Sequence, residues 1–104
     1  MAPRRREVVW ALHARQALDD ALTYIAQGSL QNARDVAARV IERAASLADL
    51  SERGSKVEEL DDPDLRQLLV DPYRLLYEVH GQQVQVVGFL HQRQDVSGWR
   101  RHAE

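Results

Sequence analysis

Apolar and polar residues follow a helical period through the first half of the chain. From Ala14 to Ile25 apolar residues recur every three or four positions, which is the spacing of one helix face. The pattern is more regular from Leu30 to Ala48, where charged residues occupy the opposite face. Gly28 is suited to end the first helix, and the Ser29 hydroxyl can cap the second. So short a connection predicts an antiparallel helical hairpin.

Strand patterns lie on both sides of this hairpin. Segments rich in valine, leucine and aromatic residues predict strands at 5–11, 65–70, 73–80 and 84–90. The polar, acidic segment 51–65 predicts a loop with a brief extended piece at 56–60. A turn at 80–83 joins the last two strands, so we expect them to be antiparallel.

The element order is therefore β-α-α-β-β-β, an α+β fold of two layers in which the hairpin covers one face of a small sheet. Alternation along the strand from Tyr73 places Tyr73, Leu75 and Tyr77 toward the core. Arg74 lies between them and is expected on the exposed opposite face. We expect that face to be open to solvent or to a partner.

Composition narrows the class of protein. A chain of 104 residues with 44% hydrophobic and 29% charged residues fits one globular domain. We expect this domain to span residues 1–104, with a basic arm at 1–6 and a polar tail at 96–104. Cysteine is absent, which excludes disulfides and thiolate metal sites. With no long apolar run and no secretory signal, we expect a cytoplasmic protein without membrane contact.

Charge is unevenly distributed along the chain. The net charge is −2, yet 13 of the 14 basic residues are arginine, and residues 49–71 hold eight acidic residues against three basic ones. The planar fork of arginine suits carboxylates and phosphates, so the bias indicates an anionic partner. It is also typical of a high-GC genome. A chain so close to neutrality is not a general nucleic-acid binder.

Three segments together resemble the RelE/ParE superfamily of bacterial type II toxins. The first is the hairpin, ALDDALTYIA and then ARDVAARVIERAASLADL, which follows VVW. The second is RQLLVDPYRLLYEVHGQQVQVVGFL, in which Pro-Tyr-Arg opens an alternating strand, and the third is the ending LHQRQD. The resemblance covers residues 8–95. The acidic stretch before Arg66 and the turn at residues 72–74 are similar to the ParE branch.

The resemblance implies a growth-inhibiting toxin whose cognate antitoxin wraps it in a hetero-oligomer. It implies inhibition of DNA gyrase in the ParE branch, and metal-independent cleavage of ribosome-bound mRNA in the RelE branch. DNA would be contacted only through the antitoxin, and no cofactor is implied. A degenerate copy that retains antitoxin binding and operon repression is a third reading.

The same resemblance nominates residues for the target. Arg74 in PYR and Arg93 in HQR match arginines of RelE-type active sites, and we expect both to contact the target in either branch. For a nuclease, His91 is suited to carry a proton, and Arg66 lies near the strand lysines of that branch. The lysine pair is missing, and Trp99 stands near the position of the terminal tyrosine. This departure favours binding over catalysis, and no catalytic residue is assigned.

We expect the antitoxin to bind an apolar groove formed by the hairpin and an edge of the sheet, because small alanine side chains allow close approach. The expected contacts are Ala33, Val36, Ala37 and Val40 in the second helix, with Glu58, Glu59, Asp61 and Asp62 in the acidic loop. These acids are expected to meet basic residues of the antitoxin or of this chain. The four histidines are scattered, so no metal site is expected.

Overall fold

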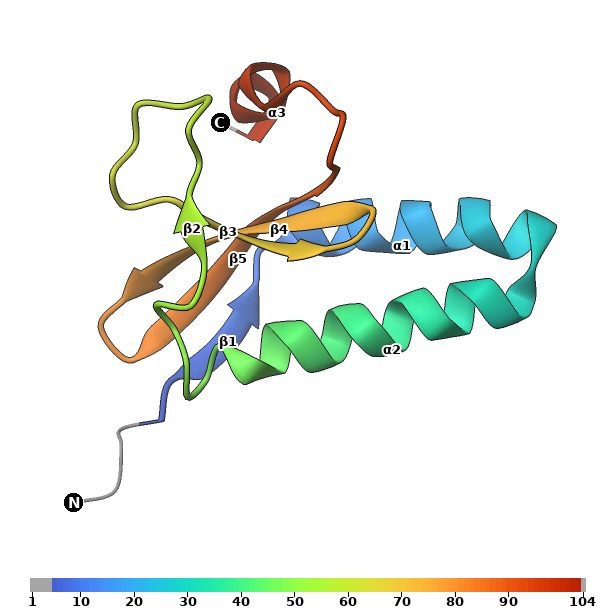
Figure 1. Ribbon diagram of the computed structural model, residues 1–104, viewed down its shortest axis with the longest axis horizontal. Helices are drawn as coiled ribbons and strands as arrows, with labels where there is room; N and C mark the ends of the chain where they lie inside the picture. The colour runs from blue at the N-terminus through green and yellow to red at the C-terminus, as the bar shows by residue number, and fades with distance from the viewer. Residues whose placement is uncertain (1–4, 104) are drawn as a thin grey trace.

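The computed structural model describes the backbone of residues 5–103 and the side chains of residues 5–99 (Figure 1). The helices of the hairpin are α1 (Leu12–Gly28) and α2 (Leu30–Ser46). The strands are β1 (Glu7–Trp10), β2 (Ser55–Lys56), β3 (Arg66–Val70), β4 (Tyr73–His80) and β5 (Gln83–His91). A further helix, α3 (Val96–Ala103), follows them. The α+β class and the predicted order of helices and strands are confirmed.

The five strands form one sheet in the order β1-β5-β4-β3-β2. β3, β4 and β5 are antiparallel neighbours, as the short turns predict. Gly81 in the β4–β5 turn has a φ of 59°, a conformation that glycine adopts without steric cost. The extended piece expected at 56–60 is instead the two-residue strand β2. β1 lies beside β5 and parallel to it, so segments from both ends of the chain meet in the sheet.

The main core lies between the hairpin and one face of the sheet. α1 contacts β5, and α2 contacts β3. Leu75 and Tyr77 are fully buried on this face together with Val40 of α2, as the alternation of β4 predicts. Each such side chain contributes about 1.5–3 kcal/mol on burial. The Ser29 hydroxyl accepts the N–H of Asn32 at 3.1 Å and caps α2 as expected.

The opposite face of the sheet is partly covered, contrary to expectation. A polar tail was expected at 96–104, but α3 folds back and buries Val96 and Trp99 against Leu76 and Leu90. The loop between β2 and β3 adds Val57 and Leu65 to this second cluster. Figure 1 shows α3 and this loop above the sheet, with α2 below it. We call the face under α3 and this loop the second face.

The close contact between α3 and β5 at Gly88 makes a testable prediction. A Cβ on Gly88 would lie 2.7 Å from the Trp99 ring, so Gly88→Ala forces α3 away from the sheet. We expect the free energy of unfolding to fall by about 1–3 kcal/mol, the usual cost of overpacking. Tryptophan fluorescence should also show that Trp99 is more exposed to solvent. Gly28→Ala is the control, because nothing lies near a Cβ there. Equal stability of the two variants would contradict this packing.

The basic arm at 1–6 is partly fixed to the domain. Arg4 lies outside the described residues, and Arg5 forms an exposed ion pair. Arg6 Nε donates to the Gly81 carbonyl at 2.9 Å and its Nη1 donates to Ser51 Oγ at 2.8 Å. Arg6 is therefore fixed to the domain by these two hydrogen bonds. Within the described part of the chain, no helix is both long and apolar enough to cross a membrane.

Candidate functional site

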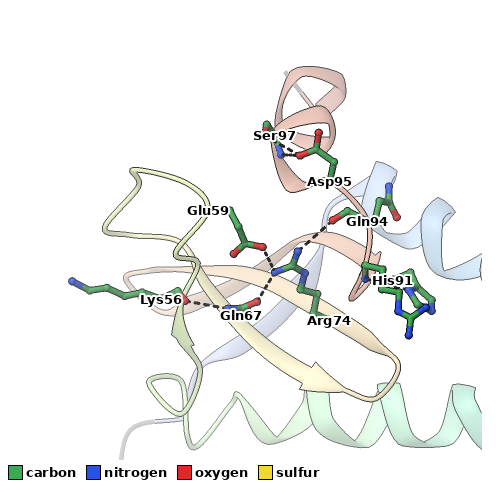
Figure 2. A network of polar contacts seen from close by, with 9 residues as sticks. Lys56, Glu59, Gln67, Arg74, His91, Gln94, Asp95 and Ser97 are labelled. Carbon is green, nitrogen blue, oxygen red and sulfur yellow. Dashed lines mark hydrogen bonds and ion pairs between the residues drawn. The ribbon is translucent and has the colours of Figure 1, made fainter.

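Arg74 is the buried polar centre of the second face, not an exposed residue as expected (Figure 2). Its side chain is 8% exposed. Nη1 donates to Glu59 Oε2 at 2.8 Å and to Gln67 Oε1 at 3.0 Å, and Nη2 donates to the Gln94 carbonyl at 3.3 Å. Gln67 in turn donates to the Lys56 carbonyl at 3.1 Å. One guanidinium therefore links the loop before β3, β3 itself and the segment before α3.

Glu59 balances the charge of this buried arginine. Its carboxylate is half-exposed and comes from the acidic loop. The hydrogen bond from Arg74 lowers the pKa of Glu59 below its usual value of 4.5, against the opposing effect of burial. The arginine is thereby neutralised within the chain.

Glu59→Gln is expected to destabilise the protein at neutral pH. Because the folded pKa lies below the unfolded value, the carboxylate contributes stability above pH 4.5 and loses it as the pH falls through the folded pKa. Urea unfolding at pH 7 and at pH 3 should therefore show a difference between variant and wild type that shrinks in acid. Glu58→Gln serves as the control, since Glu58 is exposed. A difference independent of pH would contradict the ion pair.

A tight turn after β5 carries His91 and Arg93. The N–H of Gln94 donates to the His91 carbonyl at 2.8 Å, and the N–H of Gln92 donates to the Pro72 carbonyl at 2.9 Å. The N–H of Arg93 donates to His91 Nδ1 at 3.2 Å. The side chains of His91 and Arg93 are exposed. This turn, residues 91–95, offers a fixed backbone with an exposed cation.

Of the four residues considered for nuclease chemistry, His91 and Arg93 share the turn after β5, but Arg74 lies on the other face of the sheet from Arg66 and His91. Residues opposite one another on neighbouring strands share a face of the sheet. Arg66 lies opposite Tyr77, and His91 lies opposite Tyr73, and both tyrosines pack in the core under the hairpin. Arg74 lies on the other face and points to Glu59. Arg66 donates instead to backbone carbonyls at the end of the α2–β2 connection.

A large hollow lies between α1 and the ends of β4 and β5. It encloses about 570 Å³. One face of α1 forms one wall, through residues spaced from His13 to Tyr24, a length of about 16 Å at 1.5 Å per residue. The other wall holds Tyr73, which stacks on Phe89 with 4.9 Å between ring centroids, and Trp99 of α3. We call this hollow the α1 groove.

Residues 8–96 match the sequence model of a protein family, the ParE toxin of the type II toxin–antitoxin system parDE. The chain belongs to this toxin family. The resemblance to the RelE/ParE superfamily, and to its ParE branch, is confirmed.

A solved structure supports the fold of this ParE-family chain. The chromosomal ParDE toxin–antitoxin system from P. aeruginosa matches with a TM-score of 0.70 and 18% identity, over 85% of this chain and 97% of that chain. At this identity the match shows the fold alone. A search of the curated proteins found no match.

The structure places the expected antitoxin contacts of this ParE chain in different environments. Ala33, Val36 and Val40 are between 0% and 8% exposed, and Val36 and Val40 belong to the main core, whereas Ala37 is half-buried. Val36 also borders a second hollow of about 500 Å³ beside Tyr73. The expected docking face of α2 is therefore mostly occupied by the chain itself.

The four acidic residues expected to contact the antitoxin also differ in exposure and in bonding partners. Glu59 is bound by Arg74, whereas Glu58 and Asp61 are exposed. Asp62 is half-buried, and its Oδ1 accepts the N–H of Asp64 at 3.1 Å.

The sequence pattern did not predict the α1 groove of this ParE-family chain. Ala17 and Ala21 looked like ordinary core positions of a helix, yet they are only half-buried in the groove. The signal that could have located it is Tyr24, a large residue with 76% exposure just beyond them. Among the described residues, no three histidine or acidic side chains lie together as metal ligands would.

Proposed function

We propose that this ParE-family toxin inhibits growth by binding DNA gyrase, without chemistry of its own. The supporting observation is the arrangement around Arg74. A phosphoryl-transfer site needs cations and proton carriers around one phosphate. Here the matching arginine is bound by Glu59, and His91 lies on the opposite face of the sheet. That arrangement favours binding to a protein surface over catalysis. The turn at 91–95 would form the contact with gyrase. The toxin would act in the cytoplasm, where gyrase is found.

Inducible expression without antitoxin tests this proposal. Gyrase inhibition should induce the DNA-damage response and block supercoiling by purified gyrase, while leaving ribosome-bound mRNA uncut. Arrested translation with cleaved mRNA would overturn the proposal in favour of an endonuclease. The absence of both effects would indicate a degenerate toxin that serves in antitoxin binding and operon repression.

We further propose that the antitoxin, encoded by a small reading frame beside the gene, neutralises the toxin by occupying the α1 groove. The groove is mostly apolar and open, and it is formed by α1, the ends of β4 and β5, and Trp99 of α3. These are the properties of a site for the apolar face of a partner segment. Hydrogen exchange should show protection of residues 13–24 in the complex. Complex formation without protection there would exclude this groove.

The exposed acids of the loop before β3 are expected to act on the rate of antitoxin binding. Exposed ion pairs contribute only about 0–1 kcal/mol each, but they steer association. Replacing Glu58 and Asp61 with amides should slow association with the antitoxin and reduce its salt dependence, with little change in stability. Unchanged rate and salt dependence would assign these acids to solubility.

A further inference from the structure

The contacts of Arg74 form a directional link between the acidic loop and the turn at 91–95. A guanidinium is planar and rigid, so fixing one nitrogen sets where the others point. Glu59 and Gln67 both hold Nη1, at 2.8 and 3.0 Å. This leaves Nη2 directed at the Gln94 carbonyl, at 3.3 Å. Figure 2 shows the three contacts converging on Arg74 from separate segments.

Arg93 stands between Gln92 and Gln94, both of which are anchored by hydrogen bonds. On one side, the Gln92 N–H is bonded to the Pro72 carbonyl at 2.9 Å. On the other, Gln94 is bonded through its N–H to His91 and through its carbonyl to Arg74. Because the Arg93 side chain is exposed, its position depends on these backbone bonds. The buried side chain of Arg74 reaches the Gln94 carbonyl from β4.

We propose that Arg74 is a positioning residue: it holds the turn at 91–95 so that Arg93 meets the target in a fixed geometry. Arg74 itself does not contact the target. A group held in its bound conformation loses less entropy on binding, which raises affinity without adding a contact. The effect of Arg74 on inhibition rests on the proposed function, whereas its hold on the turn is a property of the free toxin.

Two variants test the hold on the turn in the free toxin. Arg74→Lys keeps the charge opposite Glu59 but loses the fork that reaches Gln94. Glu59→Gln leaves Arg74 in place and removes its charged partner. We expect hydrogen exchange at the Gln94 amide to become about tenfold faster in the first variant, because the charged hydrogen bond that holds the turn is lost, and to accelerate less in the second. Arg15→Lys, on exposed α1, is the control and should change nothing.

A double-mutant cycle tests whether Arg74 acts through Arg93. Gyrase inhibition should weaken about tenfold in Arg74→Lys and more in Arg93→Ala, and the double variant should be no weaker than Arg93→Ala alone. Additive losses would show that Arg74 contacts the target itself and would overturn the proposal. Unchanged exchange at Gln94 in Arg74→Lys would also overturn it. A wild-type toxin that fails to inhibit gyrase would refute the proposed function, while the exchange measurement still decides whether Arg74 holds the turn.

Discussion

A toxin carrying Ala21→Arg is expected to lose antitoxin affinity by at least about 100-fold while remaining folded. Ala21 is half-buried in the wall of the α1 groove. An arginine there fills the groove and sets a charge against its apolar wall, which is unfavourable for an apolar partner segment. A hundredfold loss corresponds to about 2.8 kcal/mol, within the range for a blocked interface centre. Titration calorimetry with the antitoxin measures the effect.

Ala45→Arg is the matched control for this variant. Ala45 is also on the hairpin, but it is exposed on α2, away from the groove. It should bind antitoxin with wild-type affinity. Equal losses in the two variants, or wild-type binding by Ala21→Arg, would place the antitoxin elsewhere.

Arg93→Ala is expected to raise the concentration of toxin needed to inhibit gyrase by about 30-fold or more. Arginines at the centre of interfaces commonly contribute about 2 kcal/mol or more. Since the Arg93 side chain is exposed and the turn is bonded through its backbone, the variant should fold and bind antitoxin normally. Arg93→Lys should restore inhibition only in part, because lysine keeps the charge without the planar fork. A supercoiling assay with purified gyrase gives the values.

His91→Ala separates this result from a nuclease mechanism. Loss of an acid–base group would lower mRNA cleavage on the order of 100-fold. In the binding mechanism His91→Ala has a smaller effect than Arg93→Ala. Full inhibition by Arg93→Ala at normal protein levels would remove the turn from the mechanism.

The spacing of apolar residues was sufficient to predict those helices and strands that bury one continuous apolar face. The helical hairpin and the inward-facing Leu75 and Tyr77 lie where the pattern of apolar residues predicts them. The sequence did not predict α3, because Val96 and Trp99 are the buried apolar side chains in the part of the helix whose side chains are described, and their neighbours there are polar or glycine. Two residues cannot define a period, and their burial depends on the bare backbone of Gly88 opposite Trp99.

The environment of Arg74 could not be predicted for a related reason. An arginine in an alternating strand is exposed unless another segment covers that face. Here α3 and the acidic loop do so, and the partner, Glu59, is fifteen positions away in a loop without periodicity. Of the α2 residues predicted to contact the antitoxin, Ala33 and Val40 are buried within the chain's own fold, so little of their surface is open to a partner. The helix that keeps an open apolar wall is α1.

The parallel pairing of β1 with β5 has a consequence for synthesis on the ribosome. β1 is made first, but its partner residues are 83–86, more than 70 positions later in the chain. Local contacts allow the helical hairpin to form early, whereas the sheet cannot close until β5 has been made. The fold is therefore expected to complete only after residues 83–86 have been made. An antitoxin already present at that moment would meet each toxin chain as its sheet closes.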